Sequence, residues 1–204
     1  MSERFRSTSE FLRHATRSLT AHFGQLGARL GWQPNAITVL GLLPALIAAL
    51  LAAQAQFLAA GLVLMLGAPL DALDGAVARA SGRSTRFGAL LDSTVDRYAD
   101  ALLFGGIGYA FAQTGDLLGV LLAFGALSGA YAVSYVRARA EGLHIGSIQD
   151  GLFDRAARLI VLILALLTGS VALGLLILTI GAHLTALQRL WLAHRVAQDD
   201  EAQL

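Results

Sequence analysis

The sequence predicts an all-α membrane protein with six transmembrane helices, an amphipathic helix that precedes them in the membrane interface, and both termini in the cytoplasm. Three observations support this fold class. Of the 204 residues, 56% are apolar and only 14% are charged, whereas water-soluble domains carry about 25% charged residues. The apolar residues form long windows that are separated by short polar breaks. The arginines are absent from alternate breaks.

Apolar windows predict the transmembrane helices, since a span needs about 20 mostly apolar residues. The windows are residues 36–53, 58–78, 88–111, 117–136, 152–167 and 171–192. The breaks near residues 55, 115 and 169 are only a few residues long, which predicts tight hairpins in a compact bundle. We therefore expect a six-helix transmembrane domain over residues 34–196 and a polar C-terminal tail over residues 197–204.

The distribution of arginine predicts the orientation of these helices. All 15 basic residues are arginine, and none lies in the three tight hairpins. Because cytoplasmic connections are enriched in arginine, both termini and the arginine-bearing connections are expected in the cytoplasm. This predicts a multi-pass protein of the cell membrane whose polar site faces the cytoplasm. The net charge of +1 gives no indication of nucleic-acid binding, and a chain without cysteine has no disulfide or thiolate metal ligand.

Residues 1–33 form a different kind of segment. Phe5, Leu12, Leu19 and Leu26 recur every seven residues, while the arginines occupy other positions of the repeat. This pattern predicts an amphipathic juxtamembrane helix that lies in the interface, with its arginines directed at anionic headgroups.

Two pairs of aspartates interrupt the apolar sequence at the ends of the second and third windows. Asp71 and Asp74 are three residues apart, and Asp92 and Asp96 are four residues apart, so each pair shares one face of its helix. A carboxylate inside a transmembrane helix costs about 3 kcal/mol, and the short connection between these helices is expected to bring the pairs together. Clustered carboxylate oxygens are the ligands that Mg²⁺ or Mn²⁺ prefers, which makes these residues candidate metal ligands.

Two other interpretations of the aspartates stay open. The carboxylates could form a structural charge network with nearby arginines, namely Arg79, Arg83, Arg86 and Arg97. They could also line a cation or proton pathway of a transporter. A transporter would not require the glycines and arginine that lie between the two pairs.

Gly75, Arg79 and Gly88 indicate that a phosphorylated ligand accompanies the metal. Glycine inside a helix costs about 1 kcal/mol relative to alanine, so both glycines are expected to let a ligand approach the backbone. Arg79 lies one turn beyond Gly75 and can bind phosphate oxygens with its guanidinium group. Together with a metal, these residues predict a diphosphate site for a lipid-attached substrate, with phosphoryl transfer as the reaction.

The spacing of these residues resembles a known family signature. The pattern Asp71-x2-Asp74-Gly75-x2-Ala78-Arg79-x8-Gly88-x3-Asp92-x3-Asp96 matches every fixed position of the signature of the CDP-alcohol phosphotransferase family. The resemblance implies an enzyme in which an alcohol hydroxyl displaces CMP from a CDP-linked lipid such as CDP-diacylglycerol. It also implies a homodimer.

The same resemblance implies a role for each residue of the signature. Asp71, Asp74, Asp92 and Asp96 would hold the metal, expected as a pair of Mg²⁺ or Mn²⁺ ions, and Asp96 would also accept the proton of the attacking hydroxyl as the catalytic base. The CDP-lipid would contact the signature and the segment that opens the first span, namely Pro34, Asn35, Ala36, Ile37, Thr38, Gly75, Ala78, Arg79, Thr85 and Gly88.

The acceptor alcohol is predicted from arginines near the last three windows. Several converging arginines indicate an acceptor with its own phosphate, although membrane anchoring accounts for part of the set. The segments SYVRARAEGL (134–143) and DRAARL (154–159) resemble the phosphatidylinositol-phosphate synthase branch of the family. That resemblance implies inositol phosphate as the acceptor, bound by Arg137, Arg155, Arg158 and Arg189.

Two positions depart from this branch. Arg137 stands where lysine is often found, and Ala157 stands where an acidic residue is often found. The alternatives are therefore glycerol 3-phosphate as the acceptor, as in a phosphatidylglycerophosphate synthase, and inositol phosphate with an archaeal-type ether lipid as the donor.

Overall fold

The computed structural model describes residues 21–146, 148, 151 and 153–201. Residues 21–29 are helical. They are followed by α2 (Pro34–Leu40), α3 (Leu42–Ala53), α4 (Phe57–Ala80), α5 (Arg86–Gln113), α6 (Leu117–Gly142), α7 (Arg155–Thr168) and α8 (Val171–Glu201). The all-α class is confirmed for the described part of the chain. α2 and α3 together correspond to the first predicted window, and one helix corresponds to each of the others.

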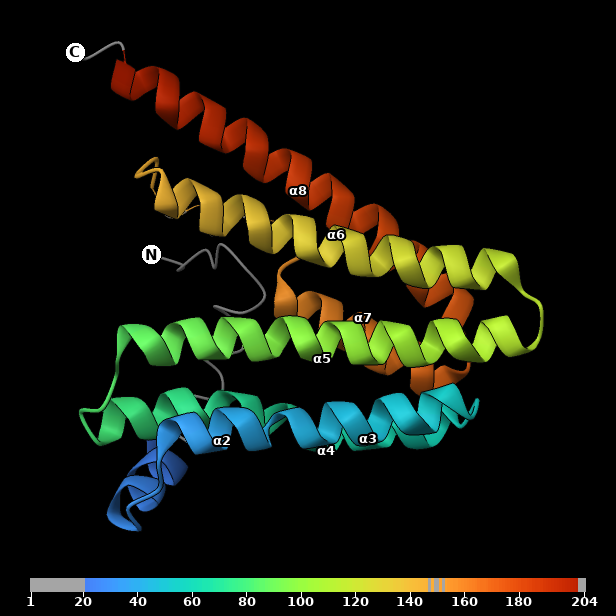
Figure 1. The fold of residues 1–204 in the computed structure, drawn as a ribbon, viewed down its shortest axis with the longest axis horizontal. Helices are drawn as coiled ribbons and strands as arrows, with labels where there is room; N and C mark the ends of the chain where they lie inside the picture. Colours follow the sequence, from blue (N-terminus) through green and yellow to red (C-terminus); the bar gives the residue numbers. More distant parts are fainter. Residues whose placement is uncertain (1–20, 147, 149–150, 152, 202–204) are drawn as a thin grey trace, which may run out of the picture.

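The packing of the helices places α2 and α3 between the two helices that carry the aspartates. α3 packs against α4 and α5, and α2 contacts the same two helices. On the other side, α7 packs against α4 and α8, while α6 packs against α5 and α8. Figure 1 shows α6 and α8 running together along one edge of the bundle and α2 and α3 at the opposite edge.

Small residues allow the central helices to approach closely. Ala45, Ala48, Ala49 and Ala52 are the buried residues of α3. A Cβ atom on Gly106 of α5 would overlap the backbone carbonyl of Ala49, so the absence of a side chain permits this contact. Close backbone approach at small residues is the usual way in which transmembrane helices pack.

Four spans are long and apolar enough to cross a membrane by length and composition: Pro34–Ala53, Phe57–Ala80, Leu117–Gly142 and Val171–Asp199. The windows at 88–111 and 152–167 are not among them. α5 carries Asp96, Arg97 and Asp100 near its middle, and α7 has only 14 residues, or about 21 Å. For these two helices a transmembrane path stays a prediction.

The connections that lack arginine lie at one end of the bundle. Figure 1 shows the turns at residues 54–56, 114–116 and 169–170 at the right, while the α4–α5 connection and the C-terminal ends of α6 and α8 lie at the left. Asp74 near the end of α4 and Asp92 near the start of α5 belong to the left end. The aspartates and the arginine-bearing connections therefore share one end of the bundle.

The amphipathic pattern predicted for residues 1–33 lies largely outside the described residues, as do residues 202–204 of the predicted tail. The helical residues 21–29 rest on α4, because Cβ atoms at Gly24 and Gly27 would overlap atoms of that helix. Several apolar side chains of this segment are exposed instead, namely Phe23, Leu26 and Leu30. The described part of the segment thus has a glycine face toward the bundle and an apolar face away from it.

Candidate active site

The start of the first span makes a hydrogen bond to one of the signature aspartates. Pro34 begins α2, where its fixed φ suits a helix start. One turn later, Thr38 donates a hydrogen bond from Oγ1 to Oδ2 of Asp74 on α4, with 2.6 Å between the oxygens. Both residues are only 8% exposed, and a hydrogen bond to a charged group is worth about 1.5–3 kcal/mol. The segment that was predicted to border the CDP group therefore also orients a predicted metal ligand.

The same segment reaches the start of α5. A Cβ atom on Gly88 would lie 3.2 Å from Oδ1 of Asn35 and 3.2 Å from Oγ1 of Thr85. Thr85 is the N-cap of α5, and its Oγ1 accepts a hydrogen bond from the backbone N–H of Gly88 at 2.9 Å. Three predicted CDP-lipid contacts from distant parts of the sequence thus lie together.

On α4, the guanidinium group of Arg79 lies over the backbone of Gly75. A Cβ atom on Gly75 would lie 3.2 Å from Nη1 of Arg79, so the arginine side chain extends back along the helix over the glycine. This arrangement suits a phosphate group, which the guanidinium can bind with two hydrogen bonds. Ala36, Ile37 and Ala78, the other predicted contacts, lie on the same two helices, α2 and α4. Asp71 also belongs to α4, but its side chain lies outside the described residues.

Asp96 lies on α5 and pairs with an arginine of α7. Its Oδ1 is 2.7 Å from Nη2 of Arg155, and its Oδ2 is 3.5 Å from Nη2 of Arg97. Arg155 begins α7, directly after Asp154, which caps the helix by accepting a hydrogen bond from the N–H of Ala157 at 2.9 Å. The fold therefore brings the predicted catalytic base and a predicted acceptor-binding arginine together.

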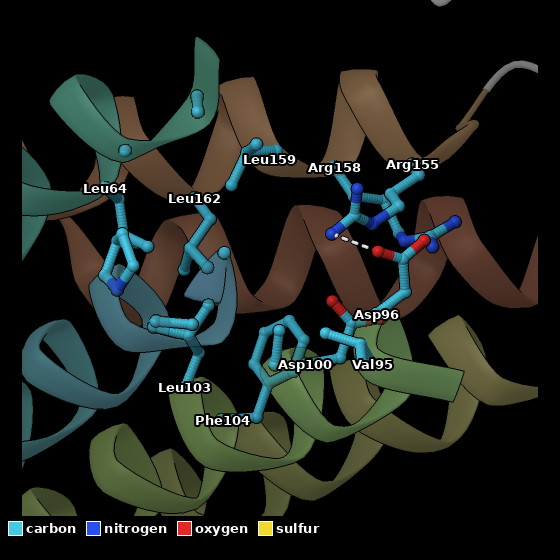
Figure 2. Close-up of a pocket in the computed structure, with 16 residues that line it drawn as sticks. Leu64, Val95, Asp96, Asp100, Leu103, Phe104, Arg155, Arg158, Leu159 and Leu162 are labelled. Atoms are coloured by element: carbon cyan, nitrogen blue, oxygen red, sulfur yellow. Dashed lines mark ion pairs between the residues drawn. The ribbon is translucent and has the colours of Figure 1, made fainter. Parts of the chain in front are cut away.

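Asp96 and Arg155 line a cavity of about 60 Å³ between α3, α4, α5 and α7. Figure 2 shows Arg155 and Arg158 directed from α7 toward Asp96, with Leu162 and other apolar side chains at the far end. Asp100, one turn beyond Asp96, lines the same wall. The cavity thus has a polar end with two acids and two arginines, and an apolar end. A volume of this size holds a few waters or one edge of a polyol.

Two predicted acceptor arginines are buried against backbone carbonyls. Arg158 lines the cavity, is 5% exposed, and donates from Nη1 to the carbonyl oxygen of Phe153 at 3.0 Å. Arg189 of α8 is also 5% exposed and donates from Nη1 to the carbonyl oxygen of Val133 in α6 at 3.0 Å. A guanidinium group carries five N–H donors in total. Arg189 does not belong to the lining of the described cavity.

Arg137 has a different environment. Its Nε lies 3.0 Å from Oε1 of Glu141, one turn later on α6, and both side chains are more than 40% exposed. Of the predicted acceptor arginines, the structure brings Arg155 and Arg158 to the cavity and leaves Arg137 outside its lining.

Asp100 and Arg97 are site residues that the family signature does not contain. Oδ2 of Asp100 lies 3.8 Å from Nε of Arg97. Both atoms are buried and have no hydrogen-bond partner among the described residues. The sequence did carry a signal for Asp100, because Asp92, Asp96 and Asp100 recur every four residues and therefore share a helix face.

The signature aspartates offer the kind of ligand atom that a divalent metal prefers. They supply only oxygen ligands, which suits Mg²⁺ or Mn²⁺. Asp74 and Asp96 are 8% and 9% exposed, and carboxylates so shielded from water need a cation or several hydrogen bonds nearby. Within the described side chains, which exclude that of Asp71, no three acids or histidines form a ready metal cluster. The ion pairs of Asp96 with Arg155 and Arg97 also fit the alternative of a structural charge network.

Comparison with known sequences identifies relatives of this chain. The profile for CDP-alcohol phosphatidyltransferase matches residues 32–187. An archaetidylinositol phosphate synthase of Pyrococcus horikoshii is 38% identical over 172 residues, which cover 84% of this chain and 89% of the relative. A phosphatidylinositol phosphate synthase of Streptomyces avermitilis is 37% identical over 153 residues, which cover 74% of this chain and 62% of the relative.

The fold is similar to that of a phosphatidylinositol phosphate synthase from Mycobacterium tuberculosis. Its crystal structure with CDP-DAG bound has a TM-score of 0.77 and 29% identity, covering 86% of this chain and 94% of the other. Its structure in complex with manganese and citrate has the same TM-score and identity and covers 85% of this chain and 88% of the other. The family profile spans most of the chain. The chain belongs to the CDP-alcohol phosphatidyltransferase family.

Proposed function

We propose that the protein transfers the phosphatidyl group of CDP-diacylglycerol to a hydroxyl group of inositol phosphate and releases CMP. The acceptor oxygen forms a bond to the phosphorus that carries the diacylglycerol, the bond from that phosphorus to the CMP oxygen breaks, and the hydroxyl proton passes to a base. The observation that carries this proposal is the 2.7 Å contact between Asp96 and Arg155 in one cavity. A proton acceptor beside a phosphate-binding group supports a phosphorylated alcohol as the acceptor.

The relatives support the same substrates. The relative from Pyrococcus is named as an archaetidylinositol phosphate synthase, and the relative from Streptomyces is named as a phosphatidylinositol phosphate synthase. The Mycobacterium tuberculosis enzyme was crystallised with CDP-DAG bound.

The donor is proposed to bind along α2 and the end of α4. Arg79 would hold its diphosphate over the open backbone at Gly75, and Asn35 and Thr85 would border the cytidine side near Gly88. Thr38 would keep the Asp74 carboxylate directed at the diphosphate, since the 2.6 Å hydrogen bond removes its freedom to rotate. These residues hold the reacting phosphorus at the polar end of the cavity, where Asp96 can accept the proton of the attacking hydroxyl.

Asp71, Asp74, Asp92 and Asp96 are proposed to hold two Mg²⁺ or Mn²⁺ ions, and the manganese complex of the Mycobacterium tuberculosis enzyme supports a divalent metal. A bound divalent metal would neutralise the charge that develops on the diphosphate during transfer. Asp74 and Asp96 stand on different helices, α4 and α5, so the close packing of both against α2 sets the spacing of these ligands.

The acceptor phosphate is proposed to bind Arg155 and Arg158. Arg155 would exchange its contact with Asp96 for the acceptor phosphate, which would leave the Asp96 carboxylate open to the hydroxyl. Arg189 and Arg137 stay proposed contacts of the phosphate. Arg189 would use N–H groups beyond the one bonded to Val133, and Arg137 would have to leave Glu141.

We also propose the membrane arrangement that the arginines predict. All six helical windows would cross the cell membrane, both termini and the active site would face the cytoplasm, and residues 1–33 would lie in the interface. The protein would act as a homodimer. The concentration of the arginine-free turns at one end of the bundle supports this orientation.

The test also includes other donors and acceptors. The 38% identity to an archaetidylinositol phosphate synthase favours an ether-lipid donor as the second candidate. A glycerol 3-phosphate acceptor would use the same arginines. The transporter alternative predicts no release of CMP.

The experiment is an assay of CMP release by the purified protein in detergent. CDP-diacylglycerol or a CDP-activated diether lipid is combined in turn with inositol phosphate, free inositol and glycerol 3-phosphate. We expect turnover with CDP-diacylglycerol and inositol phosphate, and little with free inositol. Preference for glycerol 3-phosphate or an uncharged alcohol would reject the proposed acceptor, and the absence of CMP release with every pair would reject the reaction.

A further inference from the structure

Asp100 is a buried acid that the proposed reaction does not use. It lies on α5 one turn beyond Asp96 and lines the same cavity. Its side chain is 17% exposed, and the nearest cation is Nε of Arg97 at 3.8 Å. Its Oδ2 is fully shielded from solvent and has no hydrogen-bond partner among the described residues. Because Oδ2 is shielded and faces Arg97, a ligand reaches this side chain only where it lines the cavity. A ligand group that donates a hydrogen bond to the carboxylate there is stabilised.

The chemistry of the cavity limits what that ligand group is. A carboxylate only accepts hydrogen bonds and repels phosphate, so Asp100 selects a hydroxyl group. Arg155 and Arg158 on the opposite wall supply the positive charge that a phosphate requires. The wall of α5 therefore suits the hydroxyl side of a phosphorylated polyol, and the wall of α7 suits its phosphate (Figure 2).

The spacing along α5 limits the size of the acceptor. Positions four residues apart in a helix are about 6 Å apart along its axis. If the attacking hydroxyl meets Asp96, a second hydroxyl must lie several ångströms away to reach Asp100. A ring polyol carries hydroxyls on both sides of its ring and can meet both acids. Glycerol 3-phosphate has its two hydroxyls on neighbouring carbons and cannot.

We propose that Asp100 is a specificity-determining residue that accepts a hydrogen bond from a non-reacting hydroxyl of a cyclic polyol phosphate. The proposal rests on the proposed function, because it concerns the acceptor of that reaction. A purely structural role, as the counter-ion of Arg97, would affect all acceptors alike. The selectivity between acceptors therefore distinguishes the two roles.

The test compares wild type with Asp100→Asn and Asp100→Ser in the full chain, in lipid nanodiscs. For each protein, kcat/KM is measured with inositol phosphate and with glycerol 3-phosphate, together with the KM for CDP-diacylglycerol and the melting temperature. Asp199→Asn, an exposed acid near the end of α8, is the matched control for loss of one carboxylate. We expect the ratio of kcat/KM between the two acceptors to fall about 10- to 100-fold in both Asp100 variants, the size of one charge-assisted hydrogen bond. The KM for CDP-diacylglycerol should match wild type in both Asp100 variants. The Asp199→Asn control should match wild type in every measured quantity.

A second arm varies the acceptor. Wild type is assayed with monodeoxy analogues of inositol phosphate, each of which lacks one hydroxyl. At least one analogue that keeps the attacking hydroxyl should lose about tenfold or more in kcat/KM, and folded Asp100 variants should not distinguish it from the parent compound. An unchanged acceptor ratio in the Asp100 variants, or wild-type tolerance of every analogue, overturns the role of Asp100. Failure of wild type to use inositol phosphate rejects the proposed function instead, before any variant is considered.

Discussion

The carboxylate of Asp96 and the guanidinium of Arg155 form an ion pair across the cavity, with 2.7 Å between Oδ1 and Nη2. Asp96 belongs to α5, and Arg155 begins α7. Their side chains are 12% and 30% exposed, so salt screens this pair less than a pair at the surface. The contact links the residue proposed to accept the proton with a residue proposed to bind the acceptor phosphate.

Loss of Arg155 should selectively weaken binding of the acceptor. Arg155→Ala is expected to raise the KM for inositol phosphate about 10- to 100-fold, because one charge-assisted hydrogen bond is worth roughly 1.5–3 kcal/mol. The donor KM should change little, since Arg79 and the metal are proposed to hold the diphosphate. Initial rates at varied acceptor and donor concentrations measure both values. Arg195→Ala is the matched control, because Arg195 stacks on Trp191 at 4.5 Å, outside the cavity lining. Poor membrane insertion with unchanged KM values would identify Arg155 as a topology signal.

Loss of the Asp96 carboxylate should slow the chemical step. Asp96→Asn is expected to lower kcat by about 10²- to 10⁴-fold, the usual contribution of a positioned base. Affinity for the CDP-lipid should fall much less, because three other aspartates stay available to the metal. Direct binding of the donor and single-turnover rates separate the two effects. An equal loss of donor affinity and of rate would show that Asp96 acts mainly as a metal ligand.

Removal of divalent metal should stop turnover. Excess EDTA is expected to abolish CMP release, and Mg²⁺ or Mn²⁺ should restore it. Asp74→Asn should have the same effect without unfolding the protein, because the amide can still accept the hydrogen bond from Thr38. Metal titrations of activity and a melting curve of the variant measure this. Full activity in excess EDTA would contradict the proposed metal site.

The hydrogen bond that Thr38 of α2 donates to Asp74 should increase the affinity of the proposed site for metal. Thr38→Val keeps the shape of the side chain and removes the hydroxyl, whereas Thr38→Ser keeps the hydroxyl. We expect Thr38→Val to raise the metal concentration for half-maximal activity about tenfold or more, because Asp74 loses a bond worth about 1.5–3 kcal/mol. Thr38→Ser should stay near wild type. Equal behaviour of the two variants would mean that the hydroxyl does not orient Asp74.

The close approach of α3 and α5 should depend on one of two adjacent glycines. Gly106→Ala is expected to destabilise the protein by about 1–3 kcal/mol, the usual cost of overpacking, because its Cβ would overlap the carbonyl of Ala49. Gly105→Ala is the control, since a Cβ there meets nothing within 4 Å. That variant should be neutral or slightly more stable, because alanine favours a helix. Melting temperatures in detergent compare the two, and similar values would argue against tight packing at Gly106.

The helices and the grouping of aspartates within each helix were predictable because they depend on local properties of the chain. Apolar length predicted the order of the helices and their first residues to within three positions, and the positions of the arginine-free turns followed from the same windows. The windows 117–136 and 171–192 ended too early, because α6 and α8 continue to Gly142 and Glu201 through polar sequence. The spacing of Asp92 and Asp96 placed both on one face of α5, because a helix repeats every 3.6 residues. Resemblance to the family signature added the expected roles of these residues.

The contacts between helices were decided only by the tertiary structure. Among 15 arginines, the sequence named four for the acceptor, and the fold brings Arg155 and Arg158 to the cavity while Arg137 faces Glu141. The sequence also left Asp100 unassigned. The partner of a side chain depends on how its helix is rotated and how closely its neighbours approach. Those quantities come from the packing of all helices at once, including contacts such as Gly106 against Ala49, and no local pattern in the chain contains them.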